Sequence, residues 1–151
     1  MSHSLFLVGR GLHRSTDDGL LVWINAEDHL SLVATSNSGR MSEVYGRIVR
    51  GMETINQELD FQQHQRLGYL NFSPTNIGTA LQVDMYVQLL DGSKLDRLMD
   101  VSRKLDMHIE PREESNVFHV SNMIRLGRTE FHIVRGMLDG VQQLIEHDLH
   151  G

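Results

Sequence analysis

The sequence predicts an α+β fold, in which a mainly antiparallel β-sheet is flanked by helices. Short runs of alternating apolar and polar residues indicate strands, and longer segments with apolar residues three or four positions apart indicate amphipathic helices. The first two predicted strands are joined by a link too short for a crossover helix, so they should be antiparallel neighbours. Strands and helices also lack the regular alternation of a parallel sheet, which favours the α+β class.

The first half of the chain contains two predicted strands and one helix. Residues 20–25 form a short apolar run, and apolar and polar residues alternate over 30–35. Only a few residues around Asp28 and His29 separate the two runs. Over residues 41–59 the apolar side chains recur every three or four positions, which predicts a helix with one apolar face.

The middle of the chain is predicted to hold two strands and a helix. A short strand is expected at residues 68–72, followed by a loop over 75–79. Over residues 83–90 apolar residues occupy every second position, which predicts a strand with one more apolar face. The turn at residues 91–93 should cap a helix over 94–106.

The C-terminal part is predicted to contain an irregular segment, a strand and a long helix. Residues 108–115 are polar and expected to be irregular, whereas residues 117–120 form a short strand. Thr129 can cap the final helix. The side chains expected to face the core from this helix are Phe131, Val134, Leu138, Val141 and Ile145.

Length and composition exclude several classes of protein. The 151 residues fit one domain, and 14 basic against 20 acidic residues give a net charge of −6, which argues against a nucleic-acid partner. Without cysteine there is no disulfide, thiolate metal site or cysteine nucleophile, and the histidines lack zinc-protease spacing, so no metal is expected. No apolar run is long enough for membrane insertion. No secretory signal is expected from the N-terminal residues, so an intracellular location, cytoplasmic or mitochondrial, is expected.

Two polar segments are candidates for function. The acidic link at residues 25–29 can hold a cation through charge-assisted hydrogen bonds, or its Asn and Asp can simply build a turn. The segment 73–79 can be an active-site loop or a turn shaped by proline and glycine. Residue types and spacing alone favour the structural interpretation of both.

Three motifs together resemble those of the phosphagen kinases, the ATP:guanidino phosphotransferases that include arginine and creatine kinase. LVWINAEDHL at residues 21–30 resembles the family's LVWVNEEDHL, and GYLNFSPTNIGT at 68–79 resembles GYLTFCPTNLGT. VFHVSN followed by RLGRTE, within residues 117–130, resembles VYDISN and RLGLTE. The resemblance implies that residues 9–151 form part of the C-terminal catalytic domain, an antiparallel sheet flanked by helices, and that residues 1–8 are an N-terminal extension.

The resemblance also implies roles for individual residues. In the family, a glutamate of the acidic motif positions the guanidinium with the help of a cysteine, while arginines clamp the phosphates of Mg-ATP. Glu27 matches that glutamate, as a vestigial guanidino-binding residue, and Asn76 matches its family position in the cofactor site. Ser73 occupies the cysteine position, and its hydroxyl stays neutral where a thiolate would carry charge.

The departures from the family pattern fall on the charged groups that bind ATP. Ser31, Gln82 and Glu110 stand where the family has arginine, and Arg112 is a weak candidate to replace one arginine of the mobile loop. Losing one charged clamp on a transferring phosphoryl group costs roughly 3–5 kcal/mol. We therefore predict that the domain is catalytically inactive and needs no cofactor, with Mg-ATP expected only if it is an enzyme.

An inactive domain of this kind is expected to serve as a structural or interaction subunit of a larger assembly. Fewer strands than the family's domain would leave sheet edges exposed, so a protein partner or a second copy of the chain is expected to cover the truncated side. Two alternatives stay open, which are an active ATP:guanidino phosphotransferase of the arginine or creatine kinase type and a non-catalytic binder of guanidino compounds.

Overall fold

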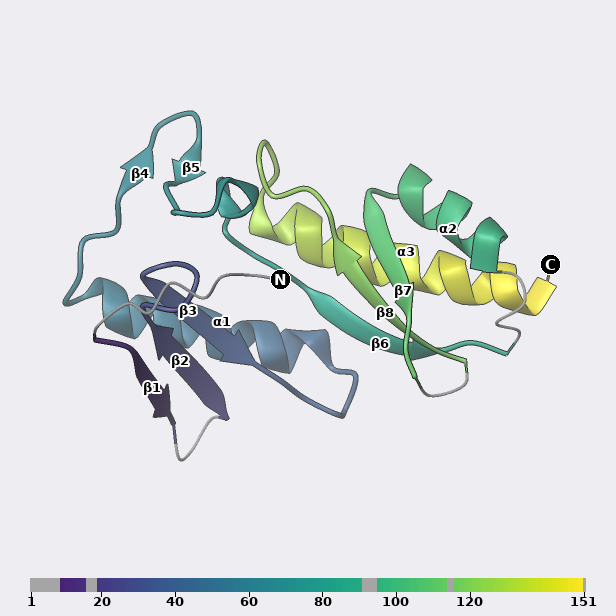
Figure 1. Cartoon of the computed structure of the whole chain (residues 1–151), viewed down its shortest axis with the longest axis horizontal. Coiled ribbons are helices and arrows are strands. Elements are labelled where there is room, and N and C mark those ends of the chain that lie inside the picture. Colours follow the sequence, from purple (N-terminus) through teal and green to yellow (C-terminus); the bar gives the residue numbers. More distant parts are fainter. Residues whose placement is uncertain (1–8, 16–18, 91–94, 114–115, 151) are drawn as a thin grey trace. The chain divides into compact units, whose positions relative to one another are not determined.

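The computed structural model describes residues 9–15, 19–90, 95–113 and 116–150, and Figure 1 labels its helices and strands. The chain divides into two compact units. The first comprises Met1–Gln65 and Tyr69–Pro74, and the second comprises Arg66–Gly68 and Thr75–Gly151. The predicted extension at residues 1–8 and the predicted cap at 91–93 lie outside the described residues.

The first unit is built on a three-stranded antiparallel sheet in the order β1–β2–β3. Its strands are β1 (Gly11–Arg14), β2 (Leu20–Ile24) and β3 (Leu30–Ala34). The antiparallel pairing of β2 with β3 confirms the prediction made from their short link. β1 was not predicted, because its four residues have no apolar alternation and are held in the sheet by backbone pairing with β2.

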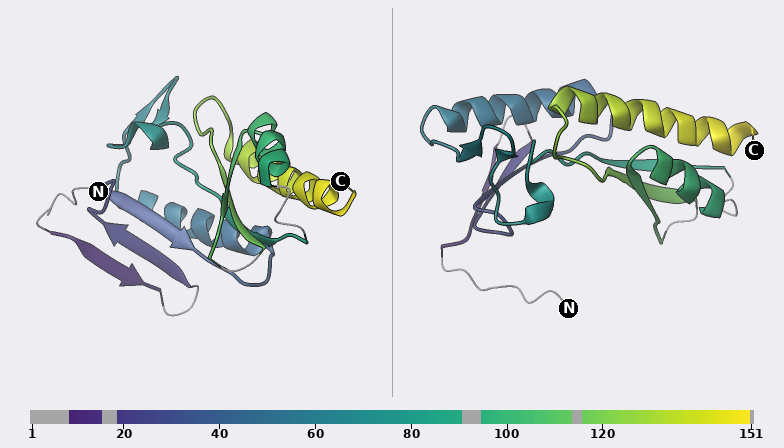
Figure 2. Two further views of the ribbon diagram at one scale, coloured as in Figure 1. Left: turned by 45° about the vertical axis from the view of Figure 1, so that its right-hand side comes forward. Right: turned by 90° about the horizontal axis from the view of Figure 1, so that it is seen from above.

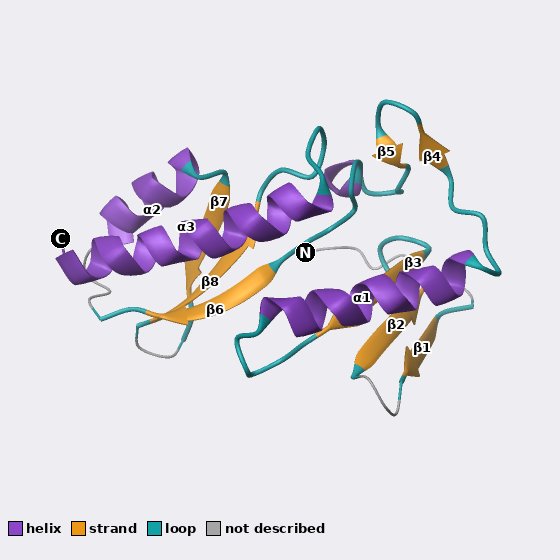
Figure 3. Cartoon of the chain, turned by 180° about the vertical axis from the view of Figure 1, so that it is seen from behind, coloured by secondary structure: helices purple, strands orange, loops and turns teal. Residues whose placement is uncertain are grey.

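Helix α1 (Met41–Asn56) packs on one face of this sheet (Figure 3). The contact is close at Gly51, where an added Cβ would lie 2.6 Å from the side chain of Leu20 and 3.2 Å from that of Leu32. A larger residue at this position would require the side chains of Leu20 and Leu32 to move. The predicted helix over 41–59 is thus confirmed, ending three residues early.

The chain passes from the first unit to the second through short elements. These are β4 (Gln63–His64), β5 (Gly68–Tyr69) and a 3-10 turn, η1 (Pro74–Asn76). The predicted strand over 68–72 is therefore only two residues long, because the residues after Tyr69 pair with no strand among the described residues. In the first unit, the Leu70 N–H donates to the Gln62 carbonyl at 3.1 Å.

The second unit contains a three-stranded antiparallel sheet in the order β6–β8–β7. The strands are β6 (Asp84–Gln88), β7 (Met107–Pro111) and β8 (Val117–Asn122). The expectation of an irregular segment at 108–115 is wrong for its first half, which forms β7. This strand alternates Met107 and Ile109, both buried, with exposed polar residues, and its pairing with β8 outweighs its polar composition.

Helices α2 (Leu95–Lys104) and α3 (Glu130–His150) pack against this sheet and each other (Figure 2). The core between the sheet and the helices is mainly apolar. Thr129 caps α3 as predicted, because its hydroxyl accepts the backbone N–H of His132 at 3.3 Å. The apolar side chains buried in this core include Leu98, Met107, Phe118, Val120, Met137 and Leu144.

The predicted inward face of α3 is wrong. Phe131, Leu138 and Ile145 are exposed, with 70%, 39% and 38% of their surface accessible. The helix instead buries a neighbouring stripe of side chains. That buried stripe consists of Ile133, Met137, Val141 and Leu144, and only Val141 belongs to the predicted face. Both stripes have helical spacing, so the sheet decides which one is covered.

Together the antiparallel sheets and covering helices confirm the predicted α+β fold. No helix in the described part of the chain combines the length and apolar character needed to cross a bilayer.

Candidate functional site

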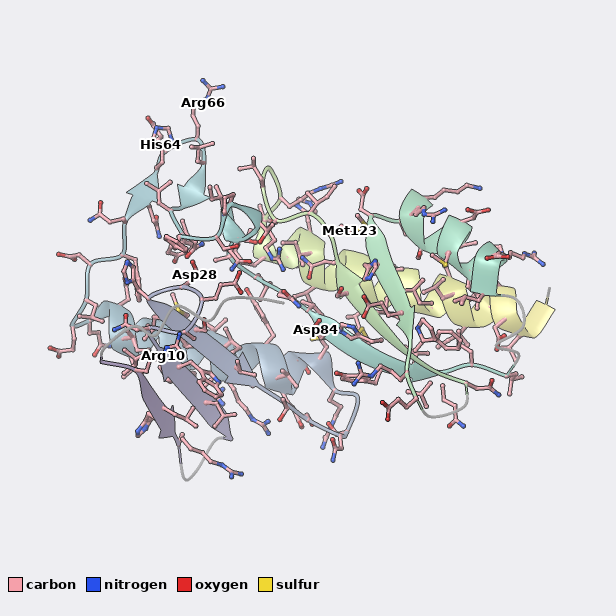
Figure 4. All side chains as sticks on the ribbon, viewed as in Figure 1. Arg10, Asp28, His64, Arg66, Asp84 and Met123 are labelled. Atoms are coloured by element: carbon pink, nitrogen blue, oxygen red, sulfur yellow. The ribbon has the colours of Figure 1, made fainter. Side chains whose placement is uncertain are left out.

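The acidic link between β2 and β3, residues 25–29, forms a hydrogen-bonded turn in the first unit. Asn25 has a left-handed backbone with φ of 51°, a conformation that Asn adopts readily. Its N–H donates to the His29 carbonyl at 2.9 Å and closes the turn. Within it, the side chain of Asp28 is buried (labelled in Figure 4), whereas that of Glu27 is exposed. The link therefore presents one carboxylate to solvent and uses the other internally.

The Asp28 carboxylate binds the second candidate segment. Its Oδ1 accepts the backbone N–H of Ser73 at 3.1 Å, although 45 residues separate the two positions. The acidic link and the start of the segment 73–79 are therefore neighbours, and the exposed Glu27 sits beside the anchored Asp28. Ser31 is half-buried on β3, opposite Trp23 of β2.

In the second unit, one face of the sheet carries a continuous row of polar contacts. The Gln82 amide donates to the Asp84 carboxylate at 2.9 and 3.1 Å, and Asp84 Oδ1 lies 2.8 Å from His119 Nε2 (Asp84 is labelled in Figure 4). His119 Nδ1 lies 3.8 Å from Glu110 Oε2, and His108 Nε2 lies 2.8 Å from Glu110 Oε1. The two sequence-predicted positions Gln82 and Glu110 thus belong to one network of side chains.

Glu110 is held in its ionised form by this network. The pKa of its carboxyl lies below the ordinary value of 4.5, first because the His108 imidazole hydrogen-bonds to it and adds positive charge when protonated. His119 lowers the same pKa further when it is protonated, and burial opposes the shift. A negative group therefore stands on this face at neutral pH.

We expect the unfolding free energy of the Glu110→Gln variant to fall less steeply at acidic pH than that of the natural chain. A lowered pKa in the folded state gives stability that is present above the unfolded value, near 4.5, and is lost as the pH falls through the folded value. Urea unfolding between pH 3 and pH 7 should show a steeper acid loss for the natural chain than for the variant. Glu113→Gln removes the same charge from a side chain with no ion pair among the described residues, and an equal flattening there would contradict the assignment.

Arg125 is a site residue that the residue pattern did not single out. Its guanidinium donates to the Thr75 carbonyl at 2.7 Å and to Gln82 Oε1 at 2.5 Å. Its carbonyl accepts the N–H of Thr79 at 3.3 Å. Arg125 therefore holds the loop that contains Asn76 close to Gln82, which lies two residues before β6. The RLGRTE motif carried this residue, but only the three-dimensional contacts show what it does.

Arg112 follows β7 and lies on the same face of this sheet as the polar row. The guanidinium carbon of Arg112 stands 6.0 Å from the centre of the Tyr86 ring, a cation–π distance, and the backbone N–H of Arg112 donates to the Val117 carbonyl at 2.9 Å. Tyr86 and His119 also contact each other, with ring centroids 5.3 Å apart. Among the described residues, no three histidine or acidic side chains are arranged to hold a metal ion.

Comparison with known proteins identifies relatives along nearly the whole chain. Residues 3–150 match the family described as ATP:guanido phosphotransferase, C-terminal catalytic domain. Arginine kinase from Artemia franciscana is 34% identical over 145 residues, covering 91% of this chain and 41% of that protein. A probable arginine kinase from Caenorhabditis elegans is 33% identical over 144 residues, covering 91% and 40%. The chain thus spans about two fifths of these relatives' length.

Solved structures with a similar fold come from the same group of enzymes. The substrate-free duplicated taurocyamine kinase from Schistosoma mansoni superposes with a TM-score of 0.83 at 26% identity, covering 95% of this chain and 20% of that one. A lombricine kinase superposes with a TM-score of 0.81 at 30% identity, covering 93% and 42%. The fold, the three motifs and the sequence relatives all point to one family.

Proposed function

Since this chain belongs to the ATP:guanido phosphotransferase family, we propose that it is a catalytically inactive phosphagen-kinase-like domain that serves as a structural or interaction subunit of a larger assembly. The main support is the charge on the polar face of the second sheet. Glu110 remains ionised there, and its row includes a second carboxylate, that of Asp84. Phosphoryl transfer needs fixed positive charge around the phosphates, whereas the fixed charges of this row are its two carboxylates, because His108 and His119 are charged only when protonated.

The residues present do not fit the phosphates of Mg-ATP. Gln82 is engaged by Arg125 and Asp84, and Glu110 is engaged by His108. Arg112 is directed to the Tyr86 ring and is the arginine nearest in sequence to Glu110. A nucleotide would have to displace these contacts and would meet the carboxylates of Asp84 and Glu110, while the nearby guanidinium of Arg125 is already bound to Thr75 and Gln82. We therefore infer that no phosphoryl group is transferred by this domain.

The first unit supports a second candidate, a non-catalytic binder of guanidino compounds. Glu27 is exposed on a turn that Asp28 anchors to Ser73. A carboxylate on a rigid turn can accept a guanidinium through two parallel charge-assisted hydrogen bonds. Ser73 adds no negative charge of its own, because a serine hydroxyl is neutral at pH 7.

The interaction role is supported by an exposed apolar face on the first sheet. Leu12 and Trp23 are cross-strand neighbours, and Val33 lies on the same face, opposite the side that packs against α1. All three side chains are exposed, and β1 stands at the edge of its sheet. Exposed apolar side chains beside an open edge are typical of surfaces that bind another protein. An intracellular location for this assembly, cytoplasmic or mitochondrial, remains a prediction.

The decisive experiment measures ligand binding and phosphoryl transfer in the full chain. We expect no phosphotransfer above background from Mg-ATP to arginine, creatine, taurocyamine or lombricine, and no saturable heat with Mg-ATP alone. Phosphotransfer that disappears in Glu27→Gln but persists in Glu53→Gln, an exposed glutamate on α1, would overturn the proposal. Saturable binding of a guanidino compound without Mg-ATP binding would establish the second candidate instead.

The interaction role is tested separately by size-exclusion chromatography with light scattering. We expect self-association or a co-purifying protein that is lost when Leu12 is replaced by aspartate. A stable monomer without a partner from the native source would contradict this role.

A further inference from the structure

A cavity of about 190 Å³ opens in the second unit, where the end of α2, the start of β7 and the first turns of α3 meet. Its floor is apolar, because Met107, Ile133 and Met137 line it and are buried. Gly136 forms part of the wall, and apart from its chain neighbours and the backbone of its own helix nothing lies within 4 Å of the position that its Cβ would occupy. The helix therefore leaves room for an apolar group at this point.

The rim of the cavity is basic. Lys104, Arg128 and His132 line it, and Asp106 is the one carboxylate among the lining residues. Asp106 is already paired with Arg128 at 3.1 Å, whereas the ammonium of Lys104 has no hydrogen bond or ion pair with any described residue. One unneutralised cation thus remains at the rim of a chain whose net charge is −6.

His132 can supply a second donor to the cavity. The Thr129 hydroxyl oxygen accepts the backbone N–H of His132 at 3.3 Å and lies 2.9 Å from its Nδ1. When that hydroxyl donates its proton to Nδ1, the ring proton resides on Nε2, which then becomes a donor. The cap of α3 thus contacts a side chain that lines the cavity, and one of the two tautomers compatible with this contact carries a donor on Nε2.

From this arrangement we propose that the cavity binds a small organic anion, with its apolar body on the methionine and isoleucine floor and its carboxylate or phosphate head at Lys104 and His132. The cavity is smaller than the roughly 300–1,000 Å³ of sites for drug-sized ligands, which limits the body to about the size of one aromatic ring. This site is independent of the function proposed above.

The test is an NMR titration of the full chain with three small molecules that each contain one benzene ring. Benzoate and phenyl phosphate carry the two head groups, and benzamide is a neutral control. We expect saturable shifts of the Gly136 and His132 amide signals with at least one anion, with a dissociation constant below about 10 mM. Benzamide should bind about tenfold more weakly, because it lacks the charge. The comparison of the two anions identifies the preferred head group.

Matched variants separate this site from general attraction of anions. Lys104→Gln should weaken anion binding about tenfold, whereas Arg103→Gln, which removes the same charge from the adjacent position, should leave it unchanged. Gly136→Leu should fill the cavity and abolish the shifts while the circular dichroism spectrum stays that of the natural chain. Equal binding of benzamide and the anions, equal effects of the two charge variants, or no saturable shift would each overturn the proposal.

Discussion

Replacing Gly78 with alanine is expected to cost the second unit roughly 3 kcal/mol or more of its unfolding free energy. Gly78 has φ of 116°, a conformation that residues with a Cβ rarely adopt. The added Cβ would lie 2.5 Å from the Arg125 carbonyl oxygen and 2.8 Å from the Leu126 Cα. These are backbone atoms, so no side-chain rotation can relieve the collision. The loop holding Asn76 would have to separate from Arg125.

Gly127→Ala is the matched control for that variant. Gly127 also has a positive φ, of 72°, but nothing lies within 4 Å of its Cβ position, so its substitution should cost only the backbone strain, about 1–2 kcal/mol. Urea unfolding followed by circular dichroism measures both losses. If the two variants lost the same stability, the close approach of residues 78 and 125 would be wrong.

Leu144→Ala is expected to destabilise the second unit by about 2–5 kcal/mol, whereas Leu138→Ala should cost less than about 1 kcal/mol. Both leucines lie on α3, but Leu144 is 1% exposed and Leu138 is 39% exposed. Truncating the buried leucine loses its transfer free energy and leaves a cavity in the core. Truncating the exposed leucine removes little packing.

This pair of variants tests the orientation of α3 directly, because the residue type and the substitution are identical. Thermal or urea unfolding of the two proteins provides the comparison. A larger loss for Leu138→Ala would restore the face predicted from the sequence and contradict the structure. Comparable helix content in both variants would confirm that the difference comes from packing.

Much of the fold could be predicted because its signals are local. The antiparallel pairing of β2 and β3 depends on a link of few residues. The cap of α3 depends on Thr129 and His132, which are three residues apart. Interactions between residues that are close in the chain can be recognised from the residue types and their spacing.

The candidate site was predicted only in part. The resemblance to the family named Glu27, Ser73, Gln82 and Glu110, but the role of Arg125 in holding Gln82 and the loop at Thr75 could not be read from spacing. The hydrogen bond from Ser73 to Asp28 spans 45 residues and became visible only in the folded chain. Contacts between distant segments depend on how the strands are aligned, which no local pattern specifies.

Helices and tight turns depend on residues that are close together in the chain. The sequence alone therefore predicted the helices and the α+β class, and it contained the three motifs that resemble the family. Tertiary packing decided the rest. β7 exists because β8 supplies its hydrogen-bonding partner, despite the polar residues that predicted an irregular segment. On α3, two apolar stripes compete, and only the sheet determines that Leu144 is buried while Leu138 faces solvent, since burial depends on the surface that a helix meets.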